Sequence, residues 1–299
     1  MKWSVYFQRP EYLEQTRMFL ILPEYEPLVR KWCGVRDGIR ILDVGCGTGY
    51  FTRILTQGGE SVRAVGLDLE EPFINYARDA AAAAGLPIEF MVGDALALPF
   101  EDASFDLVTS HTFFTSVPNP QRAMSEMKRV LKPGGTIASV TTMSFMPQAM
   151  DAGVYPAICT WYQPFRSLAE KLFTAYNRLD PMQGYIPGIR PDRMPRFFAS
   201  QGIQQICAYP IGKMDSWSNA AIPKEQKLRW LELYYRSEVD RLNAFMALPE
   251  MQENFTEEDA ARYLELLDEK CAFLRAHPDE NGIWEWSGGA NLLITGIRP

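Results

Sequence analysis

The chain has 299 residues, of which 47% are hydrophobic, and its 30 basic and 37 acidic side chains give a net charge of −7. The hydrophobic content excludes a disordered chain and predicts a sizeable buried core. The acidic balance argues against a nucleic-acid partner, because nucleic-acid-binding proteins usually present a basic face.

Between about residues 38 and 141, short apolar runs alternate with helical stretches. The patterns predict strands at 39–44, 61–67, 88–92, 105–110 and 136–141, and helices at 50–56, 71–84 and 120–131. Such alternation indicates βαβ units, a parallel sheet and right-handed crossover connections.

This alternation of strands and helices ends after Met143. Residues 144–190 are rich in aromatic residues, prolines and methionines, and residues 223–277 have a charged, helical pattern. A helix at 191–201 and strands at 203–209 and 291–297 resume the sheet pattern. We predict a Rossmann-like α/β fold, doubly wound around a mostly parallel seven-stranded sheet. The domain spans 35–299 after an N-terminal helical leader at 1–34, and insertions at about 144–190 and 212–286 form a helical lid.

The first expected strand runs into Gly45-Cys46-Gly47-Thr48-Gly49 and then into a helix. Glycines there allow a positive φ and let the backbone approach a ligand closely, and the helix N-terminus offers free N–H groups. A glycine turn of any doubly wound fold would look similar. A dinucleotide site is a second alternative, but its third glycine is replaced by Tyr50, and Asp43 would repel a pyrophosphate.

With its flanking residues, this loop resembles motif I of the class I S-adenosylmethionine-dependent methyltransferases. Further segments resemble that family in the same order: Gly66–Leu69, Gly93–Phe100, Ser104–Val108 and Val130–Gly135. The resemblance covers roughly residues 35–142 and is closest to the small-molecule and quinone-biosynthesis type. The last segment, Lys132-Pro133-Gly134-Gly135, is interpreted as a structural turn.

The resemblance implies a set of cofactor-binding residues: Asp43, Gly45, Cys46, Gly47, Gly49, Asp68, Leu69, Asp94, Ala95, Ser110 and His111. Asp68 would accept hydrogen bonds from both ribose hydroxyls, although it could serve an NAD ribose equally well or cap the following helix. Leu69 would pack on the adenine face. Asp94 and the N–H of Ala95 would meet the adenine edge, unless Asp94 is only a turn residue.

Three of these candidates have further interpretations. Asp43 could bind the cationic amino-acid end of the cofactor or order the glycine loop. Cys46 is expected to fill space in the loop and not to react. His111 directly follows the fourth expected strand, where ligands border parallel sheets, so it is the candidate general base, although it could simply pack on the cofactor or cap a loop.

Aromatic residues also cluster before the first strand and in the first insertion. Trp3, Tyr6, Phe7 and Tyr12 could face the sulfonium through cation–π attraction or pack as the core of an added helix. In the insertion, an apolar lid containing Tyr155, Trp161, Tyr162 and Phe165 would suit a small or flat hydrophobic acceptor.

The five cysteines are scattered without a C-x-x-C pair, so we expect neither a metal site nor a disulfide framework. The N-terminus lacks a signal peptide's apolar region, and no apolar run approaches the ~20 residues of a membrane span. We therefore expect a cytoplasmic protein without a membrane partner. The sequence does not indicate its oligomeric state.

Together these features predict an enzyme that transfers a methyl group by SN2 displacement from S-adenosylmethionine to a small-molecule acceptor, with S-adenosylhomocysteine as the product. Three alternatives remain at this point. One is a methyltransferase acting on RNA or protein, another is a protein that binds the cofactor without methyl transfer, and the third is a nicotinamide oxidoreductase, which Tyr50 and Asp43 disfavour.

Overall fold

The computed structural model describes residues 3–18, 20–57, 59, 61–143, 159–178, 188–217, 220, 222–278 and 286–299. The chain divides into two compact units. The helical unit comprises Met1–Gln15, Phe145–Tyr185 and Met214–Gly288, and the sheet unit comprises Thr16–Ser144, Ile186–Lys213 and Gly289–Pro299. The expected insertions fall in the part of the chain that forms the helical unit. Whether they act as a lid stays a prediction.

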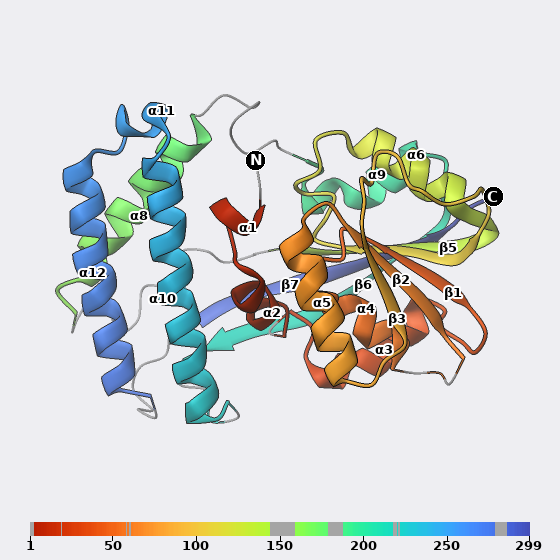
Figure 1. Ribbon diagram of the computed structural model, residues 1–299, viewed down its shortest axis with the longest axis horizontal. Coiled ribbons are helices and arrows are strands. Elements are labelled where there is room, and N and C mark those ends of the chain that lie inside the picture. The colour runs from red at the N-terminus through yellow and green to blue at the C-terminus, as the bar shows by residue number, and fades with distance from the viewer. Residues whose placement is uncertain are drawn as a thin grey trace. The chain divides into compact units, whose positions relative to one another are not determined.

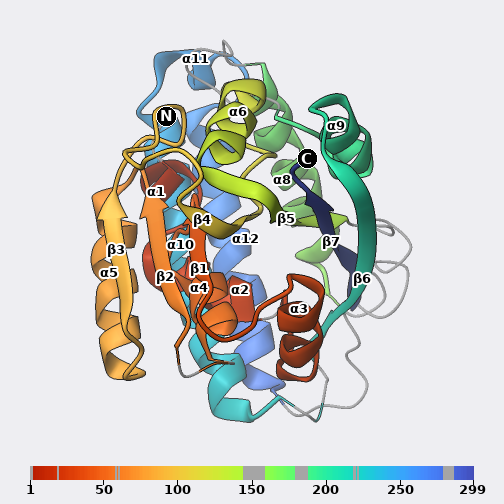
Figure 2. The same cartoon turned by 90° about the vertical axis from the view of Figure 1, so that its right-hand side faces the viewer.

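The sheet unit is built on one seven-stranded sheet with the order β3-β2-β1-β4-β5-β7-β6 (Figure 2). Pairs among β1 to β5 are parallel, and β7 runs antiparallel to β5. The predicted mostly parallel, Rossmann-like α/β fold is confirmed. The strands are β1 (Arg40–Val44), β2 (Arg63–Asp68), β3 (Ile88–Val92), β4 (Phe105–His111), β5 (Leu131–Met143), β6 (Gln204–Ser216) and β7 (Trp286–Ile297).

Helices cover both faces of this sheet (Figure 1). One face carries α3 (Glu26–Trp32), α4 (Tyr50–Thr56) and α5 (Glu71–Ala83), and the other carries α6 (Pro120–Val130) and α9 (Met194–Ser200). Short 3-10 turns, η1 (Pro23–Tyr25) and η2 (Pro191–Arg193), lead into α3 and α9. The helix α2 (Pro10–Met18) runs from the helical unit's segment into the sheet unit's.

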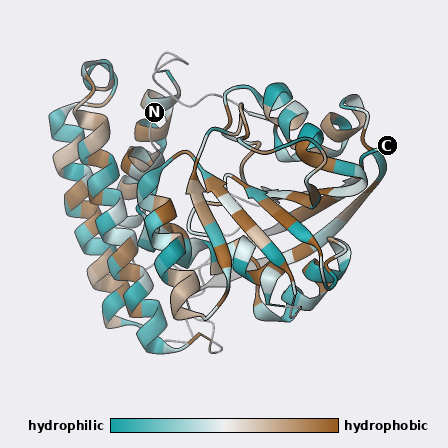
Figure 3. Cartoon of the chain, turned by 45° about the vertical axis from the view of Figure 1, so that its right-hand side comes forward, coloured by the Kyte–Doolittle hydropathy of each residue, from teal (hydrophilic) through white to brown (hydrophobic). Residues whose placement is uncertain are grey.

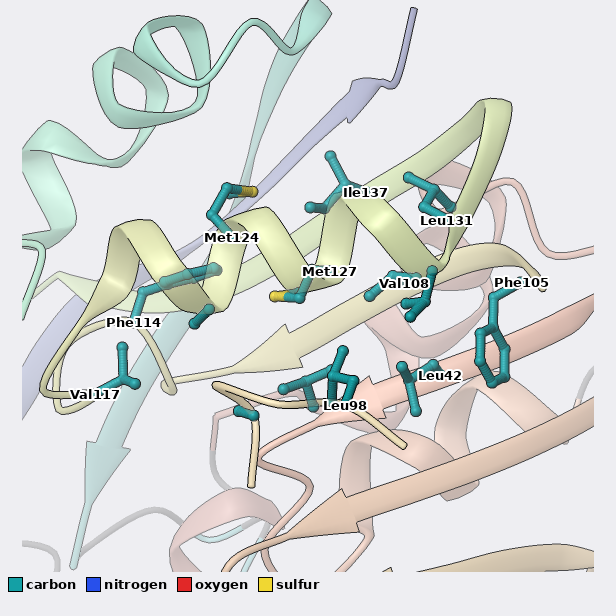
Figure 4. Packing of buried hydrophobic residues seen from close by; sticks show 14 of the residues in the cluster. Leu42, Leu98, Phe105, Val108, Phe114, Val117, Met124, Met127, Leu131 and Ile137 are labelled. Atoms are coloured by element: carbon teal, nitrogen blue, oxygen red, sulfur yellow. The ribbon is translucent and has the colours of Figure 1, made fainter. Parts of the chain in front are cut away.

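Side chains of β1 point alternately to the two faces of the sheet, and apolar residues on both faces require helices on both. Leu42 and Val44 join the core beneath α6 and α9, whereas Ile41 joins the core beneath α3 and α4. Successive strand residues point to opposite faces, so a strand buried on both sides is apolar throughout. Figure 3 shows these strands as largely hydrophobic, and Figure 4 shows the side chains packed between α6 and the sheet.

Local sequence sets the bounds of α6. The side chain of Asn119 caps the helix by accepting a hydrogen bond from the N–H of Arg122 at 3.0 Å, and Pro120 occupies the first turn. The strand β5 begins at Leu131, earlier than predicted. The predicted turn, residues 132–135, therefore lies within β5. Gly134 still adopts a turn conformation with a φ of +74°, and its N–H donates to the carbonyl of Arg298.

The helical unit contains α1 (Trp3–Tyr6), α8 (Tyr162–Asn177), α10 (Lys224–Met246), α11 (Pro249–Gln252) and α12 (Glu257–Ala276). The N-terminal aromatics pack inside it. Tyr6 stacks on Phe245 with 6.0 Å between ring centroids, and Phe7 meets Tyr176 edge-on at 5.7 Å. The structure thus gives this segment the packing role, and a role beside the cofactor stays a prediction.

The described aromatic residues of the first insertion also pack inside the helical unit. Trp161, Tyr162 and Phe165 are buried in the core of the helical unit, and Phe165 stacks on Tyr263 of α12. Tyr155 lies outside the described residues. Among the described helices, none is long and apolar enough to cross a membrane.

Removing a ring from the sheet unit's core should destabilise it strongly. Phe198 of α9 is 0% exposed, and we expect Phe198→Ala to lower the free energy of unfolding by about 3–5 kcal/mol through lost burial and a residual cavity. Urea unfolding followed by circular dichroism measures this. The control Leu28→Ala, at a side chain that is 40% exposed, should cost under ~1 kcal/mol. Equal losses in the two variants would contradict this description of the core.

Candidate cofactor-binding site

The predicted site residues come together at the carboxyl edge of the parallel sheet. The register pairs Asp43 of β1 with Thr109 of β4, and Asp68 of β2 with Val92 of β3. The loops that follow these four strands therefore lie next to one another. In open α/β sheets this edge is where ligands bind.

The glycine loop, residues 45–49, joins β1 to α4 and is held tightly. The N–H groups of Gly45 and Cys46 both donate to the carbonyl of Leu67, at 2.8 and 3.0 Å. Gly45 and Gly49 have φ values of +68° and +74°. A Cβ on Gly45 would lie 2.4 Å from the ring of Phe113, and one on Gly49 would lie 2.5 Å from the ring of Phe90. Only glycine fits at these two positions.

Asp68 links the end of β2 to the glycine loop. Its Oδ2 accepts a hydrogen bond from the N–H of Gly47 at 2.9 Å, and its Oδ1 accepts one from the N–H of Glu70 at 3.0 Å. Burial raises the pKa of this carboxyl, and the two backbone donors counteract that rise. Each carboxylate oxygen has two lone pairs, so the same group can accept further donors such as ribose hydroxyls.

Asp43 is buried beneath the loop. Its Oδ2 accepts a hydrogen bond of 2.6 Å from the hydroxyl of Thr52 on α4, and its Oδ1 has no partner among the described residues. Burial raises the pKa of Asp43 to about 7. This geometry supports ordering of the loop and of α4. Direct contact between Asp43 and a cofactor stays a prediction.

The ends of β2 and β3 present an apolar surface beside a turn. The side chain of Leu69 is 69% exposed and that of Val92 is 46% exposed. Asp94 makes the turn that the sequence offered as an alternative, because its Oδ1 accepts a hydrogen bond from the N–H of Leu96 at 2.8 Å. Ala95 is buried under this turn.

Side chains of α6 that the sequence motifs did not predict hold the β3 loop, residues 93–100. Arg122 donates to the carbonyl of Leu96 at 3.0 Å, and Glu126 accepts from the N–H of Leu98 at 2.9 Å. Arg129 donates to the carbonyls of Leu98 and Phe100 and to Glu126. The spacing i, i+4, i+7 on a helix, with a glutamate at a buried position, was the available signal.

At the end of β4 the side chains point inward. The hydroxyl of Ser110 donates to that of Ser139 at 3.1 Å, and His111 is only 7% exposed, with its ring 5.4 Å from that of Phe51. Burial lowers the pKa of His111 well below its usual value, and the charge of Arg17 lowers it further. His111 is therefore neutral near pH 7.

Cys46 is buried in the glycine loop, and burial raises the pKa of its thiol. A protonated thiol is a poor nucleophile, which agrees with the expected packing role. Among the described residues, no three histidine, cysteine or acidic side chains gather as a metal site would require.

These features fit S-adenosylmethionine. The glycine loop brings its backbone to the sheet edge without side chains at Gly45, Gly47 and Gly49, Asp68 offers acceptors for vicinal hydroxyls, and Leu69 offers an apolar face at the end of β2. A dinucleotide pyrophosphate fits less well, because the loop lies directly over the carboxyl of Asp43 and ends at Tyr50 in place of a third glycine.

Comparison with known proteins decides between these ligands. A family model described as a methyltransferase domain matches residues 42–139. The demethylmenaquinone methyltransferase of Bacillus cereus is 31% identical over 180 residues, covering 59% of this chain and 75% of that protein. The chain belongs to the class I S-adenosylmethionine-dependent methyltransferases. It is a methyltransferase whose methyl donor is S-adenosylmethionine and whose product is S-adenosylhomocysteine.

Two further similarities agree with this assignment. The demethylmenaquinone methyltransferase of Staphylococcus aureus is 40% identical over 115 residues, covering 38% of this chain and 47% of that protein. The crystal structure of a Bacillus halodurans protein assigned as a methyltransferase superposes with a TM-score of 0.52 at 17% identity, covering 92% of this chain and 99% of that chain. The second similarity concerns the fold alone.

A methyl group added to Gly49 should impair cofactor binding without unfolding the protein. Gly49→Ala places Cβ 2.5 Å from Phe90, so the loop or the ring must move, and we expect the affinity for S-adenosylhomocysteine to fall at least about tenfold. Calorimetric titration measures it. Gly85→Ala is the matched control, since Gly85 has a similar φ of +64° but no atom within 4 Å of its Cβ position. Equal affinities in both variants would count against the loop's role.

The buried Asp43 should make stability fall as pH rises. Its pKa is raised from 3.8 to about 7 in the folded state, so the folded protein keeps a proton there that the unfolded chain has lost. Over that window, wild type should lose stability relative to Asp43→Asn by about 1.4 kcal/mol per pH unit. Urea unfolding of both proteins between pH 4 and pH 8 measures the difference. A difference that does not change with pH would contradict the raised pKa.

Proposed function

We propose that the sheet unit holds S-adenosylmethionine across the carboxyl edge of β1 to β4 and transfers its methyl group to a small-molecule acceptor. The observation that carries this proposal is the Asp68 carboxylate, which is fixed by the N–H of Gly47 beside the exposed Leu69. In this arrangement Asp68 accepts from the two ribose hydroxyls. Leu69 and the β3 loop, with Asp94 and Ala95, enclose the adenine, and the glycine loop follows the amino-acid end.

When bound, the sulfonium supplies an electrophilic methyl group for in-line attack by an acceptor nucleophile. The chain's own part in the reaction is to position the partners and to exclude water. The glycine loop fixes the donor end because its backbone is tied to Leu67 and Asp68. His111, at the end of β4, is the group proposed to take a proton from an acceptor that must lose one, and its lowered pKa makes it a weak base for that step.

Several observations favour a small-molecule acceptor over RNA or protein. The two relatives are named for demethylmenaquinone, a small molecule. The net charge of −7 gives no general attraction to nucleic acid. Acceptor selection is assigned to the segments inserted after β5 and between β6 and β7. Demethylmenaquinone is the first compound to test.

Removing the Asp68 carboxylate should abolish tight cofactor binding. The variant Asp68→Ala loses the acceptors for the ribose and the anchor of Gly47, so we expect its affinity for S-adenosylmethionine and S-adenosylhomocysteine to fall about 100-fold or more. Calorimetric titration of wild type and variant with both compounds, and with NAD, measures this. Glu70→Gln, two residues further on and just before α5, serves as the control and should bind as wild type.

The same proteins then test the acceptor. With methyl-labelled S-adenosylmethionine, wild type should label demethylmenaquinone or another small molecule of an extract, and Asp68→Ala should not. Binding of NAD alone would reject the proposed placement of the cofactor. Label that enters only protein or RNA would reject the small-molecule acceptor.

A further inference from the structure

The chain turns sharply at Thr112, directly after β4. Its φ of +54° lies in the left-handed region, where a β-branched side chain is rarely found. Such a conformation persists only where surrounding contacts fix it, and it is common at functional sites. Thr112 lies between His111 and Phe113, both of which border the candidate site.

Three hydrogen bonds hold this turn. The N–H of Thr112 donates to the carbonyl of Val140 at 2.7 Å, and its own carbonyl accepts from the hydroxyl of Thr115 at 2.8 Å. Its Oγ1 accepts from Nη2 of Arg17 at 2.9 Å. The last of these is the contact from a distant segment, since Arg17 belongs to α2, 95 residues earlier in the chain.

The turn determines the position of the residues on both sides. The ring of Phe113 lies against Gly45, within 2.4 Å of the place a Cβ would take. His111 lies beside the ring of Phe51, and its Nε2 is buried with no hydrogen-bond partner among the described residues. A buried imidazole nitrogen without an acceptor disfavours protonation.

We propose that Arg17 is a positioning residue for methyl transfer. By holding Thr112 in its left-handed conformation, it places Phe113 against the glycine loop and keeps His111 fixed at the end of β4. A guanidinium suits this role, because it stays charged and directs its donors rigidly. The inference rests on the proposed function for its catalytic consequence, but the positioning itself is a property of the unliganded protein.

Two titratable groups bear on His111. Arg17 of α2 adds a positive charge that opposes protonation of the ring, and Asp43 of β1 lies on the same face of the sheet. Because burial raises the pKa of Asp43 to about 7, this carboxyl is only partly ionised near neutral pH and offsets the charge of Arg17 only in part. Phe51 of α4, whose ring lies near His111, and Val140 of β5, which pairs with it, carry no charge.

Histidine NMR tests the positioning without cofactor or acceptor, because the chain has only two histidines, His111 and His277. In Arg17→Gln we expect the pKa of His111 to rise and its ring signals to shift, while those of His277 stay unchanged. Arg17→Lys separates the effect of the charge on His111 from the effect of the hydrogen bond to Thr112, since it keeps the charge but not the guanidinium geometry. The pKa of His111 in Arg17→Lys should therefore lie near the wild-type value, while its ring signals should still shift. Arg9→Gln is the control, at an exposed arginine paired with Asp240.

A double-variant cycle tests whether Arg17 acts through Thr112. Arg17→Gln should weaken S-adenosylhomocysteine binding about tenfold in wild type and have little further effect in Thr112→Gly, whose glycine adopts the turn unaided. Additive effects, or His111 ring signals in Arg17→Lys identical to those of wild type, would overturn the proposal. If wild type itself fails to bind the cofactor, the proposed function falls, while the His111 ring signals in Arg17→Lys still decide the positioning role of Arg17.

Discussion

The site depends on the hydrogen bond between the Asp68 carboxylate and the N–H of Gly47. It joins the end of β2 to the loop that follows β1, and the same carboxylate also receives the N–H of Glu70 before α5. One side chain therefore sets the relation between the glycine loop and the start of the next helix. Because a carboxylate can accept more than two donors, this link does not prevent it from also binding a ligand.

Around this link, side chains from three helices hold the loops that follow β1, β3 and β4. Thr52 of α4 binds Asp43 beneath the glycine loop, and Arg129 of α6 binds the carbonyls of the β3 loop. Arg17 of α2 binds Thr112 after β4. A ligand that meets such fixed loops loses little free energy to ordering them, which is the advantage of a preorganised site.

Much of the sheet could be predicted from sequence, because strands buried on both faces are continuous apolar runs. β1 to β4 lie within about two residues of the predicted bounds. The last three strands are longer than predicted. β6 extends to Ser216 and β7 begins at Trp286, through residues with no apolar alternation, so pairing and not pattern sets their length.

The ligand class of the site was predictable because a short, ordered set of motifs encodes it. The hydrogen bonds within the site could not be predicted from the sequence. The bond between Thr52 and Asp43 depends on how α4 packs on β1, and the hold of Glu126 and Arg129 on the β3 loop joins residues about 28 positions apart. The left-handed Thr112 had no signal at all, since glycine and asparagine are the usual residues there.

A crystal structure of the protein with S-adenosylhomocysteine tests this placement of the cofactor most directly. We predict that both ribose hydroxyls lie within hydrogen-bond distance of the Asp68 carboxylate, that the adenine lies against Leu69, and that the hydrogen bond from Gly47 to Asp68 is intact. A cofactor bound elsewhere, or one whose ribose makes no contact with Asp68, would contradict it.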